Sequence, residues 1–395
     1  MLPPAGGLKP GQHNPGWFQT VTSRSSCGTG PLIAPYSNAT RARHEDAWGA
    51  VDRVAARDGA RDLGRYLVTG GAGYVGSHIV LALRDRGDEV VVLDDLSKGH
   101  AAAVPEGVRL VAGRCEDRRA LAEAFGSGRF DAVLHFAALS LVGDSMRDPL
   151  RYMSENLATL SAVAQAAVQH DCLRLVMSST AALFGFPERI PIDEDQRLGP
   201  VSPYGESKLM CERALEWAEK IHGLRFASLR YFNAAGADPE GRAGEDHDPE
   251  THLVPLAIDA ALGLRPPLMV FGTDYPTPDG TGVRDYVHVT DLADAHLRVL
   301  PLLETRSVRY NLGNGTGYSV REVIDTVARV SGRAVPHALG PRREGDPAVL
   351  VASSARLRAE TGWSPRFPKL EDIVRTAWDW RLAHPQGYAK DRKAA

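Results

Sequence analysis

The sequence predicts an α/β protein built around a parallel, doubly wound sheet. From residue 65 onward, short runs rich in Val, Leu and Ile alternate with longer helical stretches, and this alternation is typical of βαβ units. A glycine-rich segment separates the first apolar run from the first helical stretch, as expected where a strand turns tightly into a helix. The chain has 395 residues, of which 43% are hydrophobic, enough for two or three packed domains.

The elements can be assigned in chain order. Apolar positions such as Ile79 and Leu83 predict a helix after the first strand, and a long amphipathic segment predicts another helix over 149–170. Farther along, Ser319 and Glu322 form the pattern of a capping box, which marks the start of a helix. The expected strands of the sheet are 65–71, 89–95, 108–113, 131–137 and 174–179.

Composition and charge exclude several classes of partner. The chain has 46 Lys and Arg against 49 Asp and Glu, so we expect no basic surface for nucleic acid. Its apolar runs are far shorter than the roughly 18 residues of a membrane span, so no membrane partner is expected. Four cysteines without a CxxC pair indicate reduced thiols and a cytoplasmic protein. Residues 1–64 lack a regular apolar period, and we expect a disordered extension there.

The glycine-rich segment has the pattern of a dinucleotide-binding loop. Gly70, Gly73 and Gly76 would allow a tight turn, close approach of the backbone to a pyrophosphate, and close packing of helix on strand. The N-terminus of the following helix would face the phosphates. Asp94 ends the next strand, where a carboxylate accepts from the adenosine ribose and repels a 2′-phosphate. An ordinary turn beside a surface Asp is the alternative, but the strand–loop–helix context favours a Rossmann-type NAD site.

A second motif, SPYGESK, holds a candidate acid–base pair. Ser202 is a good N-cap and Pro203 a good first helical residue, so a helix should begin here. Tyr204 and Lys208 then lie on one face of that helix. A free tyrosine has a pKa near 10, and positive charge from Lys208, the helix N-terminus and a nicotinamide ring would favour the phenolate. We therefore expect Tyr204 to be a general acid/base, with Thr180 supplying a neighbouring hydroxyl.

Ten motifs spread over residues 65–388 carry a family resemblance. They are TGGAGYVGSH (69–78), VLDDLS (92–97), HFAALSLVGDS (135–145), MSSTAALFG (177–185), SPYGESK (202–208), LRYFNAAGA (229–237), HLVP (252–255), FGTDYPTPDGTGVRDYVHVTDLADAH (271–296), YNLGNGTGYSV (310–320) and PRREGDP (341–347). Together they resemble the UDP-glucose 4-epimerase group of the extended short-chain dehydrogenase/reductase family. Tyr-x-x-x-Lys is shared by the whole superfamily, whereas the 271–296 run with PRREGD is specific to the epimerases.

The resemblance implies an NAD-binding Rossmann domain over 65–232 and a smaller C-terminal α/β domain over 233–388 for the UDP-sugar. Some segments would cross between the two, and 389–395 would be a tail. The catalytic residues would be Tyr204, Lys208 and Thr180. The residues implied to contact NAD are Gly70, Gly73, Tyr74, Val75, Gly76, Asp94, Phe136, Ala137, Asn156, Tyr204, Lys208 and Tyr231. Those implied to contact the nucleotide sugar are Thr180, Asn233, His252, Leu253, Phe271, Arg284, Arg343 and Asp346.

The implied reaction is the interconversion of UDP-galactose and UDP-glucose through a 4-keto intermediate, by transient hydride transfer to bound NAD, in galactose metabolism and on a homodimer. Tyr204 would take the 4-hydroxyl proton with the help of Thr180. Epimerisation of a UDP-N-acetylhexosamine or a UDP-pentose is an alternative reaction. By its position, Val349 is the side chain that would limit the size of the bound sugar.

Two other functions are weaker hypotheses. A nucleotide-sugar 4,6-dehydratase needs a carboxylate acid–base pair directly after Thr180, and Ala181 and Ala182 stand there instead. A non-catalytic NAD sensor would have no use for the Thr180, Tyr204 and Lys208 set. Such a sensor would bind its ligand without converting a sugar.

Some positions depart from the family pattern. Arg114 stands where an Asp usually contacts adenine, Ser140 where some members have Lys, and Phe184 where a Tyr is usual. His252 replaces an Asn, so a sugar or phosphate contact is expected from its imidazole. The acidic and histidine-rich stretch 245–252 lacks a metal-ligand spacing on a regular element. We interpret it as a polar loop and predict no metal.

Overall fold

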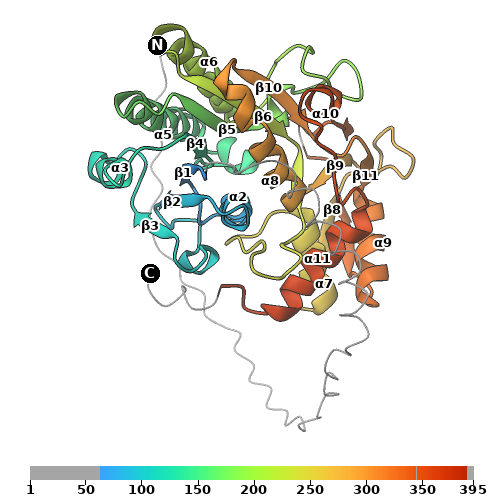
Figure 1. Cartoon of the computed structure of the whole chain (residues 1–395). Coiled ribbons are helices and arrows are strands. Elements are labelled where there is room, and N and C mark those ends of the chain that lie inside the picture. The colour runs from blue at the N-terminus through green and yellow to red at the C-terminus, as the bar shows by residue number, and fades with distance from the viewer. Residues whose placement is uncertain (1–62, 344, 389–395) are drawn as a thin grey trace, which may run out of the picture. The chain divides into compact units, whose positions relative to one another are not determined.

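A parallel sheet of seven strands forms the centre of the computed structural model, which describes residues 63–343 and 345–388 (Figure 1). Its strands are β1 (Arg65–Thr69), β2 (Glu89–Asp94), β3 (Arg109–Ala112), β4 (Ala132–His135), β5 (Arg174–Thr180), β6 (Arg225–Tyr231) and β10 (Val308–Leu312). Their order is β10-β6-β5-β4-β1-β2-β3, and every neighbouring pair is parallel. The chain therefore winds outward from β1 in both directions, which confirms the predicted fold class. The expected extension over 1–64, apart from its last two residues, and the expected tail lie outside the described residues.

Helices cover both faces of this sheet (Figure 1). One face carries α3 (Arg118–Phe125), α5 (Pro149–Gln169) and α6 (Pro203–His222). The other carries α2 (Tyr74–Asp85) and α8 (Val289–Arg298). Each apolar face of the sheet is thereby removed from water, as buried parallel strands require.

The two faces hold separate apolar cores. Leu160 and Val163 of α5 and Leu215 of α6 are fully buried in one core. Leu83 of α2 and Leu292 of α8 are fully buried in the other. Burying one such side chain contributes roughly 1.5–3 kcal/mol, so these helices are held mainly by their contacts with the sheet.

The rest of the C-terminal half forms a smaller α/β region with its own core. β9 (Val283–His288) pairs with β7 (Asn233–Ala235), β11 (Gly317–Ser319) and β13 (Val349–Leu350), while β8 (Leu268–Phe271) pairs with β12 (His337–Gly340). The helices here are α7 (Leu253–Leu262), α9 (Val320–Ser331) and α11 (Leu370–Ala383), whereas α10 (Ala355–Thr361) packs against β10. The short helices elsewhere are α4 (Val142–Ser145), η2 (Ala101–Ala103), η3 (Ala181–Leu183) and η4 (Leu300–Glu304).

Two segments of the C-terminal half, β10 and α8, pack on the large sheet rather than on the smaller region. The two regions therefore share segments that are distant in sequence. Within residues 63–343 and 345–388, no helix combines the length and the apolar character that a membrane crossing needs.

The predicted helix starts are confirmed. Ser202 caps α6, its hydroxyl accepting from the Gly205 N–H at 3.1 Å, and Pro203 is the first helical residue. Ser319 and Glu322 form both hydrogen bonds of the capping box at the start of α9, at 3.0 and 2.7 Å. The cap on α6 fixes the point at which Tyr204 enters the helix.

A buried ion pair joins α6 to the sheet. Glu212 of α6 accepts from Arg230 of β6 at 3.0 and 2.6 Å, and from the Ser179 hydroxyl of β5 at 2.7 Å. The two charged side chains are only 2% and 4% exposed. Both carboxylate oxygens of Glu212 are satisfied, which is the condition under which a buried charge is tolerated.

We expect Arg230→Met to lower the free energy of unfolding by about 3–5 kcal/mol, because Glu212 would stay buried with only the longer 3.8 Å pair to Arg309. Equilibrium unfolding in urea measures the loss. The matched control is Arg375→Met, which removes the exposed 3.1 Å pair with Glu371 and should cost less than about 1 kcal/mol. Equal losses in the two variants would show that the Glu212–Arg230 pair does not anchor α6.

Candidate active site

A cavity of about 640 Å³ lies at the carboxyl ends of the central strands. Every residue that the resemblance assigns to NAD lines it, from Gly70 of the glycine loop to Tyr231 at the end of β6. Thr180, Asn233, His252 and Leu253 of the substrate set line the same cavity. The structure thus gathers residues spread over more than 180 positions of sequence, as the crevices at the carboxyl ends of open α/β sheets do.

The glycine loop leaves no room for side chains. Gly70 has φ +71°, and a β-carbon there would lie 2.4 Å from the Ala137 backbone nitrogen. A β-carbon at Gly76 would lie 2.0 Å from the Gly70 carbonyl oxygen. These contacts explain why the turn and the helix–strand approach need glycine.

The N-terminus of α2 is open to an anion. α2 begins at Tyr74, and its N-cap, Gly73, supplies no side-chain hydrogen bond, whereas serine hydroxyls cap α6 and α9. The first N–H groups of a helix carry partial positive charge and need acceptors. Since Gly73, Tyr74 and Val75 line the cavity, this end of α2 fits the pyrophosphate of a dinucleotide.

Asp94 lies at the end of β2 and lines the same cavity. One of its carboxylate oxygens accepts from the Ala72 N–H at 2.9 Å and the other from the Leu96 N–H at 2.8 Å. Burial raises the pKa of this carboxyl, while the two backbone hydrogen bonds lower it. The loop therefore fixes the carboxylate where an adenosine ribose would be bound.

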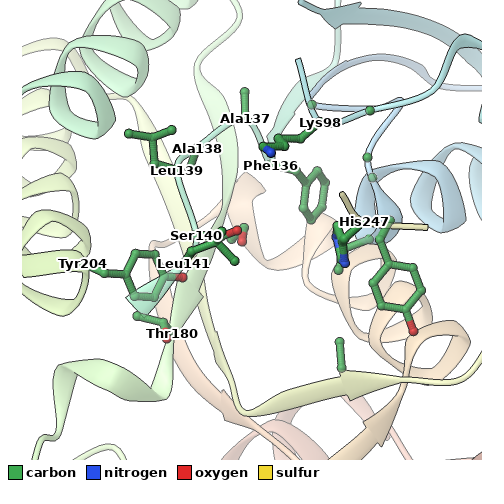
Figure 2. A pocket seen from close by; sticks show the side chains of 18 of the residues that line it. Lys98, Phe136, Ala137, Ala138, Leu139, Ser140, Leu141, Thr180, Tyr204 and His247 are labelled. Carbon is green, nitrogen blue, oxygen red and sulfur yellow. The ribbon is translucent and has the colours of Figure 1, made fainter. Parts of the chain in front are cut away.

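Tyr204 and Thr180 lie side by side in the cavity, across from Phe136 and His247 (Figure 2). Burial raises the pKa of Tyr204 to about 12, although its hydrogen bond with Thr180 acts to lower it. Lys208 is 2% exposed, and its ammonium donates to the Ser178 carbonyl at 3.1 Å. The pKa of Tyr204 is not lowered in the protein alone, because desolvation of the phenol outweighs its hydrogen bond with Thr180.

Two further polar residues lie close to this pair, and one of them, His135, was not predicted from the sequence. His135 is buried at the end of β4, its Nδ1 is 2.7 Å from the Thr69 hydroxyl, and burial together with the charge of Lys208 lowers its pKa to about 3. Ser178 hydrogen-bonds Tyr231 through its hydroxyl. His135 follows the predicted strand pattern, and only the folded sheet places it near Lys208.

Asn156, which the resemblance assigns to NAD, lines the cavity and has its side-chain amide hydrogen-bonded within the protein. Its amide donates to the Leu139 carbonyl at 3.0 Å and to the Ser207 hydroxyl at 2.9 Å, and its oxygen accepts from the Leu139 N–H at 2.8 Å. Both of its N–H groups are used within the protein. Asn156 therefore holds the Leu139 segment against the cavity and ties it to α6.

The remaining substrate residues lie together outside the cavity lining. Arg284 is paired with Asp346, and the Arg343 guanidinium lies 4.2 Å from the centre of the Phe271 ring. The Asp346 N–H also donates to the Arg343 carbonyl at 3.4 Å, which links the two pairs. Val349, the expected sugar gate, pairs with Val283 of β9 and does not line the cavity either.

The departures from the family pattern have distinct surroundings. Arg114 lines the cavity and makes long ion pairs with Glu116 at 3.3 Å and Glu155 at 3.4 Å. Ser140 also lines the cavity, whereas Phe184 is buried beneath the Arg230 guanidinium. An exposed guanidinium near the cofactor cavity is the notable change among these.

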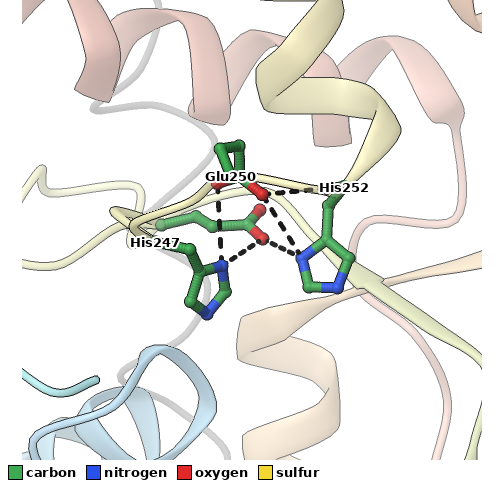
Figure 3. Close-up of side chains that lie close together, drawn as sticks. His247, Glu250 and His252 are labelled. Carbon is green, nitrogen blue, oxygen red and sulfur yellow. Dashed lines mark hydrogen bonds and ion pairs between the residues drawn. The ribbon is translucent and has the colours of Figure 1, made fainter. Parts of the chain in front are cut away.

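The polar loop before α7 gathers four potential ligands, which the spacing argument did not anticipate. Glu245, His247, Glu250 and His252 offer ligand atoms within 4.8 Å of one another (Figure 3). Burial opposes ionisation of Glu245, but its two imidazole neighbours hold its pKa near 2. Burial likewise opposes protonation of His247, yet Glu245 and Glu250 raise its pKa to about 10. The loop folds back on itself, so a regular spacing was not needed.

The parallel sheet, the open helix N-terminus and the Tyr204–Lys208 pair define a Rossmann-type dinucleotide-binding protein with an acid–base site. The NAD dependent epimerase/dehydratase family model matches residues 66–313. The chain belongs to this family.

Relatives in this family cover nearly the same span. A UDP-glucose 4-epimerase of Halalkalibacterium halodurans is 47% identical over 329 residues, which are 83% of this chain and 98% of the relative. The crystal structure of UDP-glucose 4-epimerase from Brucella ovis in complex with NAD has a TM-score of 0.78 at 42% identity, covering 80% of this chain and 98% of that one. The enzyme of that name from Bifidobacterium longum, in complex with NAD+ and UDP, has a TM-score of 0.78 at 34% identity, covering 82% and 99%.

We expect Gly76→Ala to lower the NAD content of the purified protein at least about tenfold, because the added methyl group would displace the Gly70 backbone from the phosphate loop. Acid release followed by chromatography measures the bound nucleotide. Gly199→Ala is the control, since a β-carbon there meets nothing within 4 Å. Full NAD content in the Gly76 variant would contradict a pyrophosphate site at this loop.

Proposed function

We propose that this protein is an NAD-dependent UDP-glucose 4-epimerase that interconverts UDP-galactose and UDP-glucose. The observation that carries the proposal is the meeting of Thr180, Tyr204 and Lys208 with the glycine loop in one cavity. The residues of that loop fit NAD for two reasons. The N-terminus of α2 presents uncapped N–H groups, and β-carbons at Gly70 and Gly76 would clash with the backbone of the loop. The identity of 47% over almost the whole length of a UDP-glucose 4-epimerase supports the same reaction.

The acid–base work belongs to Tyr204. Its hydroxyl is hydrogen-bonded to Thr180, so the two groups can together receive the proton of a sugar 4-hydroxyl. The chemistry that NAD supplies when bound is reversible two-electron oxidation of the sugar at C4. Lys208 is buried next to the pair, and its charge favours the phenolate form of Tyr204. Tyr204 would return the proton to the 4-oxygen as the 4-keto sugar is reduced on its opposite face.

The substrate side of the cavity suits a nucleotide diphosphate. α7 begins at Leu253, and its N-cap, His252, makes no side-chain cap hydrogen bond. Both residues line the cavity, so the positive end of α7 and the His252 imidazole can face the diphosphate. We assign Asn233 to the same substrate. Arg284 and Arg343 suit the diphosphate by their chemistry, since a guanidinium binds phosphate oxygens in pairs.

We also propose a cytoplasmic homodimer. Cys115, Cys172 and Cys211 are buried and free, which is consistent with a reducing compartment. Trp217 and Ile221 are exposed one turn apart on α6, at 62% and 65%, and offer an apolar contact for a second copy.

We expect Tyr204→Phe to slow turnover by about 10²–10⁴-fold, because the variant keeps the ring but loses the group that moves the proton. Purified protein is mixed with UDP-galactose without added NAD, and the products are separated by chromatography. The unchanged protein should form UDP-glucose to a constant ratio, without net NADH. The bound NAD content of the variant should be unchanged.

The control is Tyr66→Phe, because Tyr66 lies on β1 and does not line the cavity. This variant should keep full turnover. No conversion by the unchanged protein, even with NAD supplied, would refute the proposed reaction. Conversion by Tyr204→Phe at the normal rate would remove Tyr204 from the acid–base role.

We expect Lys208→Met to change the pH profile of kcat/KM. Removing a nearby positive charge disfavours the phenolate, so the pKa of Tyr204 should rise and less phenolate should be present at neutral pH. Activity should fall at least about tenfold at pH 7, since each pKa unit is a factor of ten, and the pH at which activity levels off should move upward. A profile that levels off at the same pH as in the unchanged protein would show that Lys208 does not act through the pKa of Tyr204.

A further inference from the structure

Two histidines and two glutamates form a cluster on the loop between β7 and α7 (Figure 3). We call Glu245, His247, Glu250 and His252 the imidazole–carboxylate cluster. The His247 Nδ1 lies 3.1 Å from Glu245 Oε1 and 3.6 Å from Glu250 Oε2. The His252 Nδ1 contacts the same Glu245 oxygen and lies 3.8 Å from Glu250 Oε1. Four donor atoms from four side chains therefore point at one small volume.

The donor set matches one class of ion. Two imidazole nitrogens and two carboxylate oxygens are ligands that Zn²⁺ accepts in four-coordinate sites, whereas Mg²⁺ and Ca²⁺ prefer oxygen alone. Zinc bonds of about 2.0–2.2 Å place neighbouring ligands of a tetrahedron at roughly 3.5 Å, close to the separations observed here. Two carboxylates with two neutral imidazoles also carry the charge that balances a divalent cation. We propose that the imidazole–carboxylate cluster is a binding site for one Zn²⁺ ion.

The surroundings of the cluster hold its ligands in place. Glu250 accepts from the backbone N–H groups of Thr251 and His252 at 2.7 and 2.8 Å, which orients its carboxylate. The His247 Nδ1 is buried and makes no hydrogen bond of acceptable geometry, although two carboxylates lie close to it. A nitrogen with this setting is better placed for a metal than for a proton shared with one oxygen. Supported ligands of this kind are usual in metal sites.

An ion could reach the cluster from two cavities. Glu245 and His247 line the cofactor cavity and also a second cavity of about 200 Å³. The loop is tied to the segment after β2, where Lys98 donates to the Asp248 carbonyl at 2.6 Å. Both imidazoles offer Nδ1, so their Nε2 atoms would stay available to the cavity. Zinc would thus fix the start of α7 without using up His252.

The site goes beyond the proposed function, because no step at C4 of the sugar needs a metal. Binding of the ion would require both Nδ1 atoms to be free of protons, because a metal-binding imidazole nitrogen is deprotonated. With all four positions taken by the protein, the site would be of the closed, structural type rather than the open, catalytic type.

The test titrates Zn²⁺ into the full chain, freed of metal with a chelator and carrying no purification tag, in competition with a chromophoric chelator. We expect one tight ion per chain. Replacement by Co²⁺ should give the visible absorption bands of a four-coordinate ion. His247→Gln and Glu250→Gln should each weaken the affinity at least about 100-fold. Circular dichroism confirms that the variants are folded.

The matched control is His337→Gln, which removes an exposed histidine on β12 and should leave zinc affinity unchanged. Equal affinity in the unchanged protein and in both cluster variants would place the zinc elsewhere and overturn the proposal. Absence of a stoichiometric ion, or displacement of zinc by Mg²⁺ at similar concentration, would overturn it as well. Because metal binding is read directly, failure of the epimerase reaction would leave this result unaffected.

Discussion

The parallel direction of all strands in the large sheet determines where the site forms. Because all seven strands are parallel, their carboxyl ends meet at one edge. The glycine loop after β1, Asp94 after β2, Thr180 after β5 and Tyr231 after β6 therefore arrive at the same cavity. A single antiparallel strand in this set would carry its terminal residue to the opposite edge. The chemistry of the cavity thus depends on backbone topology before it depends on any side chain.

The electrostatics of the cavity depend on buried groups that satisfy each other. Burial lowers the pKa of Lys208, and its ammonium donates to the Ser178 carbonyl at 3.1 Å. The same charge, together with burial, keeps His135 neutral. Glu212 lies one helical turn beyond Lys208 but is neutralised by Arg230, so it does not cancel the charge at the cavity. The buried Glu212–Arg230 pair therefore anchors α6 to the sheet. Lys208 remains the cationic group next to Tyr204.

Local signals predicted much of the structure, and long-range packing accounts for what they missed. Strands β1 to β5 and the Ser202 cap follow from apolar period and capping chemistry, which act within a few residues, whereas β6 and β10 were not predicted. The pairing of β10 with β6 could not be predicted in this way, because the two strands are separated by a long stretch of sequence and only the folded chain makes them neighbours. The raised pKa of Tyr204 could not be predicted from the sequence either, because it depends on how deeply the folded protein buries the phenol. The imidazole–carboxylate cluster was not predicted from residue spacing, because an irregular loop brings its four members together.

Two helix starts at the cavity share one feature that favours anions. α2 begins at Tyr74 after Gly73, and α7 begins at Leu253 after His252, and neither start has a side-chain cap. Both helix N-termini line the cavity, so each can receive a diphosphate, one from the cofactor and one from the nucleotide sugar. Tyr204 lines the space shared by these two ends. Anchoring at the phosphates would leave the sugar ring free to present either face of C4, which is what inversion requires.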